Sequence, residues 1–133
     1  MGTHAGEKLI VRESFAMSFG GGKIFFVQLD GLYDHKALVM EKFAQDMETL
    51  KRPSASSQAA VHLKDTAIDM EMAQSMLLQM NGPGQHLQKV AVVGLGLRDK
   101  RLFKRLIRKM DPPARYALDF FEDYEQAKMW LVK

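Results

Sequence analysis

Apolar and polar residues follow one another in blocks along the chain, and each block has the period of one kind of secondary structure. Near the N-terminus the extended apolar runs 9–19 and 23–29 flank three glycines, which permit the positive φ of a tight turn. These runs predict an antiparallel β-hairpin. The apolar runs 59–63, 90–93 and 116–121 predict three further strands, and 90–93 has the uninterrupted apolar character of a strand covered on both faces.

Four segments between and after these strands have the spacing of amphipathic helices. Asp34 is expected to cap a helix that runs to residue 51, and Thr66 and Asp69 are both suited to cap a second helix that ends near residue 81. A third helix is predicted over 99–110, before two prolines that stop it. Asp123 is expected to cap a final helix at the C-terminus.

The order of these elements predicts an α/β fold. Strands that alternate with helices need crossover connections, which give a largely parallel sheet, here opened by one antiparallel hairpin. The length of 133 residues suits one core. We therefore expect a single domain over 1–133, with residues 1–8 as a flexible segment and the four helices packed mainly on one side of the sheet.

Three segments in the last third of the chain are distinctive. They are the run Lys89-Val90-Ala91-Val92-Val93-Gly94, the basic segment after it, and the closing run Glu125-Gln126-Ala127-Lys128-Met129-Trp130-Leu131. Together with the order of elements over residues 9–133, they resemble the SpoIIAA-like proteins, which are relatives of the STAS domain of anti-sigma-factor antagonists. The resemblance implies a SpoIIAA-like (STAS) fold with a mixed, mostly parallel sheet, an N-terminal hairpin and about four helices.

The second helix of phosphorylatable STAS domains starts with Asp-Ser-Ser-Gly or a close variant, whose first serine is phosphorylated by a partner kinase. The matching stretch here is Asp69-Met70-Glu71-Met72. Met70 stands where the phosphoacceptor would be, and Glu71 places a fixed negative charge in the first helical turn, where the helix dipole stabilises it. The usual phosphorylatable serine is therefore missing. Thr66, the nearest hydroxyl, is interpreted as a cap or turn residue.

The resemblance implies a non-enzymatic regulatory or adaptor module that binds a protein partner at the start of the second helix. The candidate partner-binding residues are Tyr33, Leu38, Thr66, Asp69, Met70 and Glu71. The SpoIIAA-like fold is also similar to that of lipid-transfer domains. An apolar, lipid-like small molecule or a membrane surface is therefore an alternative partner.

Two helices carry residues suited to that alternative. Met70 and Leu78 flank Gln74 in an i, i+4, i+8 stripe outside the main apolar arc of the second helix, and flexible thioethers suit adaptable apolar surfaces, although methionine also fills core gaps. The apolar-ligand candidates are Met70, Met72, Met76 and Leu78. On the third helix six cations share one face and could meet an anionic surface, although such a run is often only a solvated face. These anionic-surface candidates are Lys100, Arg101, Lys104, Arg105, Arg108 and Lys109.

Other chemistry finds little support in the sequence. There are no cysteines, and the four histidines lack metal-ligand spacing, so we expect no metal site. Gly94 and Gly96 imitate a dinucleotide fingerprint, but Asp99 replaces its third glycine and would repel a pyrophosphate, so we expect no cofactor. His62 is interpreted as a structural histidine and no catalytic residue is assigned. No aromatic residues lie among the six cations, which disfavours nucleic acid.

The chain shows no signal for a membrane or for export. No apolar stretch approaches the ~20 residues of a membrane-spanning helix, and the N-terminus lacks an apolar signal core. A cysteine-free chain also fits a reducing compartment. The sequence therefore predicts a cytoplasmic protein.

Overall fold

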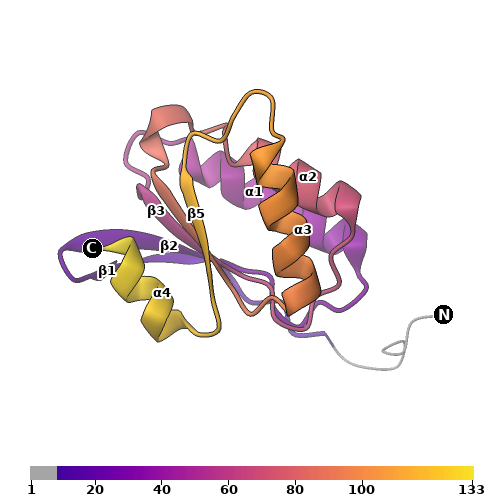
Figure 1. The fold of residues 1–133 in the computed structure, drawn as a ribbon. Helices are drawn as coiled ribbons and strands as arrows, with labels where there is room; N and C mark the ends of the chain where they lie inside the picture. Colours follow the sequence, from indigo (N-terminus) through magenta and orange to yellow (C-terminus); the bar gives the residue numbers. More distant parts are fainter. Residues whose placement is uncertain (1–8) are drawn as a thin grey trace.

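The computed structural model describes residues 9–133 and has the predicted α/β architecture (Figure 1). The expectation of a flexible segment over residues 1–8 lies outside the described residues. The strands are β1 (Phe15–Phe19), β2 (Gly22–Gln28), β3 (Gln58–His62), β4 (Lys89–Val93) and β5 (Ala117–Phe121). The helices are α1 (Lys36–Leu50), α2 (Met70–Gln79), α3 (Leu97–Arg108) and α4 (Tyr124–Leu131), with a short 3-10 turn, η1 (Gly84–His86), before β4.

The five strands form one mixed sheet in the order β1-β2-β3-β4-β5. β1 pairs with β2 in an antiparallel hairpin, and all other neighbours are parallel. β4 therefore lies inside the sheet between β3 and β5, and its apolar residues are buried. The predicted hairpin and the predicted internal strand over 90–93 are both confirmed.

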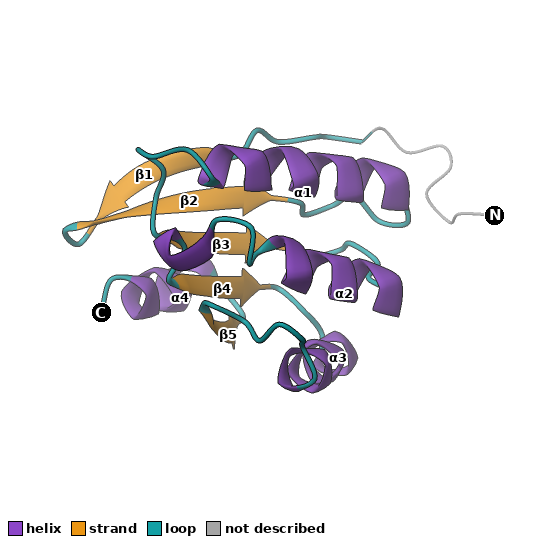
Figure 2. Cartoon of the chain, turned by 90° about the horizontal axis from the view of Figure 1, so that it is seen from above, coloured by secondary structure: helices purple, strands orange, loops and turns teal. Residues whose placement is uncertain are grey.

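The two faces of the sheet are covered differently. α1, α2 and α3 lie together on one face and α4 lies on the other (Figures 1 and 2). Alternate residues of β4 divide accordingly, because Val90 and Val92 join the core beneath α1 to α3, whereas Ala91 and Val93 join the core beneath α4. The expectation of four helices mainly on one side is thus corrected to three on one side and one on the other. Small residues such as Ala60 and Ala91 let α4 approach the sheet closely.

The first strand is shorter than predicted, since it begins at Phe15 and not at residue 9. The side chain of Ser14 ends the ladder of backbone hydrogen bonds between β1 and β2 at that point. The backbone amide of Gln28 donates to the hydroxyl of Ser14 (3.0 Å), which itself donates to Asp46 of α1 (2.6 Å). Ser14 is therefore tied to α1, and the residues before it do not pair with β2.

The start of α2 agrees with the sequence, whereas the starts of α1 and α3 differ from it. Asp69 caps α2, because its carboxylate accepts from the backbone amide of Met72 (2.8 Å). α1 has His35 and not Asp34 at its N-cap position, without a side-chain cap. α3 begins at Leu97, two residues earlier than expected, with Gly96 at the N-cap position.

Within residues 9–133, no helix combines the length and the apolar character that crossing a bilayer requires.

The last residues of β2 to β5 point toward the same edge of the sheet because these strands are parallel. The helices that follow them, α1, α2 and α3, begin near that edge (Figure 1). Loop and helix-start residues that are far apart in the sequence therefore meet there.

Candidate partner-binding groove

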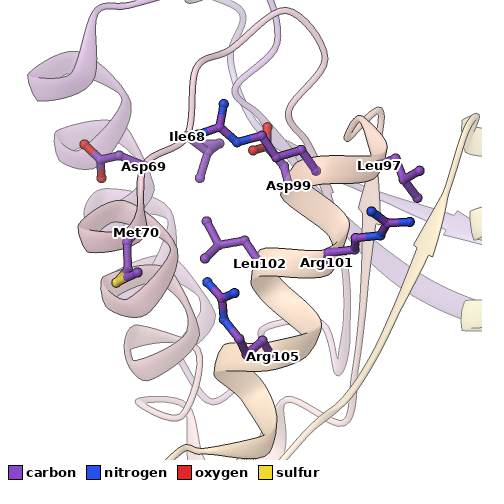
Figure 3. A pocket seen from close by; sticks show the side chains of 9 residues that line it. Ile68, Asp69, Met70, Leu97, Asp99, Arg101, Leu102 and Arg105 are labelled. Atoms are coloured by element: carbon purple, nitrogen blue, oxygen red, sulfur yellow. The ribbon is translucent and has the colours of Figure 1, made fainter.

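The starts of α2 and α3 border an open groove with a volume of about 720 Å³ (Figure 3). Its apolar lining residues are Ile68, Met70, Leu97 and Leu102. Its charged lining residues are Asp69, Arg98, Asp99, Arg101 and Arg105. The groove thus combines apolar surface with an excess of positive charge.

The apolar part of the groove is open to solvent. Met70 is 51% exposed and Leu97 is 63% exposed, and each is the first residue of its helix. Leu102 lies between them and is half-buried. In Figure 3 the side chains of Ile68, Met70 and Leu102 face one another across the groove. Exposed apolar side chains that cluster in this way mark an interaction site more often than isolated ones.

The arginines of the groove have no acidic partner among residues 9–133. Arg105 extends from α3 toward Met70 and Leu102, whereas Arg101 is turned toward Leu97 (Figure 3). Within the described part of the chain, neither of them, nor Arg98, has a carboxylate oxygen within 4.0 Å. Their positive charge is therefore available to a ligand.

The acidic residues at the start of α2 are already paired. Lys36, the first residue of α1, contacts both Asp69 (2.8 Å) and Glu71 (2.5 Å). The hydrogen bond from Lys36, and after it the one from the Met72 amide, hold the pKa of Asp69 below its usual value. The same two carboxylates raise the pKa of Lys36. Asp69 points away from the groove (Figure 3), so its charge offsets little of that of the arginines.

Asp99 is the remaining acidic residue of the lining. It lies in the first turn of α3 and is half-buried. Burial raises the pKa of its carboxyl group, although the charge of Arg98 opposes that shift. The groove therefore contains three arginines and one carboxylate whose ionised form is disfavoured by burial. Its local charge is positive.

Of the six predicted partner-binding residues, only Asp69 and Met70 line this groove. Glu71 pairs with Lys36, and the other three lie elsewhere. Thr66 is buried, and its hydroxyl donates to the carbonyl of Leu29 and accepts from the amide of Leu32 (3.1 Å). It links two loops and does not cap α2, which corrects its interpretation as a cap. Leu38 is half-buried and packs on the core. Tyr33, whose φ of 49° lies in the left-handed region, lines a separate small cavity.

The four apolar-ligand candidates divide into two pairs. Met72 and Met76 are buried in the core beneath α1, α2 and α3, where they fill space between the helices and the sheet. Met70 and Leu78 are 51% and 49% exposed, on the same side of α2 as the exposed Gln74. The stripe that the sequence placed outside the main arc therefore lies at the surface.

The six cations of α3 do not act as one surface. Arg105 lines the groove at the start of α2, and Lys109 lines its continuation farther along the helices. Lys104 and Arg108 are on the opposite flank, toward β5, where the ammonium group of Lys104 lies 5.7 Å from the ring of Phe120. Arg101 is exposed and Lys100 is half-buried. Three of the six, Arg101, Arg105 and Lys109, thus line the cavities beside α2, with Arg101 turned toward Leu97.

Sequence reasoning assigned no site role to five lining residues: Ile68, Asp99, Leu102 and the adjacent pair Leu97 and Arg98. Both were assigned to the turn after β4, because the third helix was expected to begin at Asp99. The missed signal is Gly96, since glycine is tolerated at N-cap positions and would have moved the helix start to Leu97. Gly94 makes the tight turn itself: its φ is 87°, and a Cβ there would lie 2.7 Å from the Cβ of Lys64.

A second polar cluster lies at the ends of β2 and β3. His62 Nδ1 is 3.5 Å from Asp30 Oδ1, and the ring of His62 packs edge-on against Tyr124 of α4. Burial lowers the pKa of His62, and the Asp30 charge only partly opposes this. Desolvation raises the pKa of Tyr124 to about 12. The ring of His62 thus lies between the sheet and α4, on the face opposite Val61 and Leu63, as the alternation of β3 predicted.

The described residues contain no cluster of three or more His, Asp or Glu side chains that could hold a metal ion. Comparison of the chain with protein-family models, with curated proteins and with solved structures gave no match. The groove itself and the resemblance carried by the sequence are therefore the features that bear on function.

Proposed function

We propose that this protein is a non-enzymatic binding module of the SpoIIAA-like type, which acts in the cytoplasm and recognises a protein partner at the start of α2. The observation that carries the proposal is the juxtaposition of the exposed Met70 with the unpaired Arg105 across an open groove. Methionine and arginine are enriched in protein interfaces, because one supplies adaptable apolar contact and the other directional charged hydrogen bonds.

The proposed site agrees in place, but not in chemistry, with a phosphorylation-controlled STAS site. Met70 offers no hydroxyl at the first position of the helix, and Lys36 already pairs with both Asp69 and Glu71. A partner at this site would therefore meet the apolar Met70 and the cations of α3. Recognition is expected to be constitutive and not switched by a kinase.

Site-specific photo-crosslinking in cells that produce the protein tests the proposal. A photoreactive phenylalanine derivative replaces Met70 in one variant and Met129 in the control. Met129 is 69% exposed and belongs to α4, on the other face of the sheet. A discrete protein adduct is expected at position 70 and not at position 129. Equal labelling at both positions, or adducts with lipid alone, would contradict the proposal.

A second candidate function is association with an anionic membrane surface. It is favoured by the five exposed cations of α3, which have no acidic partner within 4.0 Å among residues 9–133. Sedimentation with anionic and neutral vesicles at two ionic strengths tests it. If it holds, binding is weak, needs anionic lipid, is screened by ~0.1 M salt and falls when Lys104 and Arg108 are both changed to Glu.

A further inference from the structure

The groove at the start of α2 continues along both helices. A second cavity of about 380 Å³ lies farther along the same pair, between α2 and the C-terminal end of α3. Its lining includes Gln74 and Leu78 from α2, and Leu106, Lys109 and Met110 from α3 and the residues just after it. The two cavities have no lining residue in common, but the same two helices, which contact each other directly, border both of them. Together they form one track between the two helices.

Three rows of side chains run along this track, and each has helical spacing. The α2 wall is formed by Met70, Gln74 and Leu78, at i, i+4 and i+8. The floor on the α3 side is formed by Leu102, Leu106 and Met110, again at i, i+4 and i+8. The rim of α3 is formed by Arg98, Arg105 and Lys109, at i, i+7 and i+11.

The length of the track suits a helical ligand. Met70 and Leu78 are eight positions apart, which corresponds to about 12 Å of helix, a little more than two turns. A helix lying on the track would place apolar residues at its own i, i+3 or i+4, and i+7 positions against the floor. A ligand bound as a β-strand would need a free edge of the sheet. The edge strands are β1 and β5, and neither of them lines the track.

The charges of the track select for an acidic ligand. Its α2 wall is uncharged along Met70, Gln74 and Leu78, whereas its α3 rim carries three cations without an acidic partner among residues 9–133. The carboxylates nearest to the α2 wall, Asp69 and Glu71, are held by Lys36. Asp69 and Asp99 at one end and Asp111 at the other are the acidic residues of the lining, and Asp69 is already paired with Lys36.

We propose that the track between α2 and α3 binds an acidic amphipathic helix of a protein partner. The apolar face of that helix packs on Leu102, Leu106 and Met110, and its carboxylates meet Arg98, Arg105 and Lys109. This inference rests on the proposed function, since it names the kind of partner that the groove at the start of α2 takes.

Synthetic peptides test the inference directly. The probe is a helical peptide with leucine at every third or fourth position and glutamate along one flank of the leucine stripe. One control peptide has lysine in place of each glutamate, and another has the same composition in scrambled order. Fluorescence anisotropy is expected to show binding of the glutamate peptide alone. Binding of the scrambled peptide with equal affinity, or no binding of the glutamate peptide, would overturn the inference.

Two double variants on the same helix separate the track from general electrostatics. Arg105→Glu with Lys109→Glu reverses two charges that line the track, and Lys104→Glu with Arg108→Glu makes the same change of charge on the flank toward β5. The first double variant should weaken the glutamate peptide about tenfold or more and bind the lysine peptide better than the parent does. The second should stay within about threefold of the parent.

An equal loss in both double variants would overturn the inference and indicate diffuse attraction of anionic surfaces, as for a membrane. Circular dichroism and thermal unfolding of each variant check that the fold is intact, which is expected because all four side chains are exposed. Crosslinking at Leu78 separates this inference from the proposed function. Protein adducts at both 70 and 78 support the track, whereas adducts at 70 alone keep the proposed function and contradict the track.

Discussion

The two helices that border the groove differ in whether their charged residues form ion pairs within the described chain. At the start of α2, Asp69 and Glu71 are paired with Lys36, and Asp69 also caps its own helix. Along α3, Arg105 and Lys109 have no acidic partner among the described residues, although they lie only across the groove from α2. The carboxylates at the start of α2 therefore make contacts within the fold, whereas the cations along α3 are available to a ligand.

The apolar residues of α2 show the same division within one helix. Met72 and Met76 are buried in the core, while Met70 and Leu78 stand at the groove. Residue type alone does not separate these roles, because methionine occurs in both sets. What separates them is the partner surface: the sheet covers one side of α2 and nothing in the described chain covers the other. Measurements of stability can therefore sort each residue into one role or the other.

The largest expected effect comes from truncation inside the core. Met76→Ala should lower the free energy of unfolding by about 2–5 kcal/mol, because it removes a buried side chain and leaves a cavity. Met70→Ala, on the same helix, should change it by less than about 0.5 kcal/mol. Urea unfolding of both variants measures the difference. A similar loss in both would mean that Met70 is part of the core and not of a binding surface.

A smaller effect is expected from the cap of α2. Asp69→Ala should cost about 1 kcal/mol, since the amide of Met72 loses its acceptor. Asp69→Asn should cost less, because asparagine caps a helix as well and the ion pair with the solvent-exposed Lys36 contributes little to stability. The same urea titrations provide the comparison. Equal losses in the two variants would show that the ion pair, and not the cap, matters here.

The same carboxylate predicts a dependence on pH. The folded-state pKa of Asp69 is lowered from its ordinary value of 3.8, so the unfolded chain takes up the proton at a higher pH than the folded one. The stabilisation by the ionised Asp69 is therefore present above pH 3.8 and is lost as the pH falls through the lower folded-state value. Asp69→Asn should remove this part of the acid sensitivity. Unfolding at neutral pH and below pH 3.8 would show a constant gap between parent and variant if the prediction is wrong.

The smallest effect is expected on α3. Arg105→Gln should leave the free energy of unfolding within about 0.5 kcal/mol of the parent. Loss of a favourable cation in the last turn of the helix is offset by relief of repulsion from Arg101 and Lys109, each four residues away. A clear loss of stability in thermal unfolding would show that Arg105 has a structural role. The contrast between the two walls of the groove would then disappear.

Much of the fold could be predicted because local patterns determine it. The uninterrupted run at 90–93 indicated an internal strand, and β4 is one. Asp69 and Asp123 were expected to cap helices, and both accept from an amide three residues later. These features depend on the period of the sequence and on contacts between near neighbours. Each of these features can therefore be recognised from a short stretch of sequence.

The candidate site could be predicted only in part. The sequence indicated the start of the second helix and an exposed stripe through Met70 and Leu78, and it indicated a basic third helix. It did not indicate that Lys36, more than thirty residues away, forms ion pairs with both Asp69 and Glu71. It also treated six cations as one surface, whereas the helix directs Arg105 and Lys109 to the groove and Lys104 and Arg108 to the flank near β5.

The sequence by itself determined the order and type of the elements and which residues on each helix could face a core, because both follow from chain periodicity and local capping. The tertiary structure decided which of those faces are covered. It placed α4 alone on one side of the sheet, brought α2 beside α3, and left Met70 and Arg105 facing each other across an open groove. The physical reason is that burial and charge pairing depend on residues far apart in the chain, whose meeting is fixed only when the parallel strands set the helices side by side.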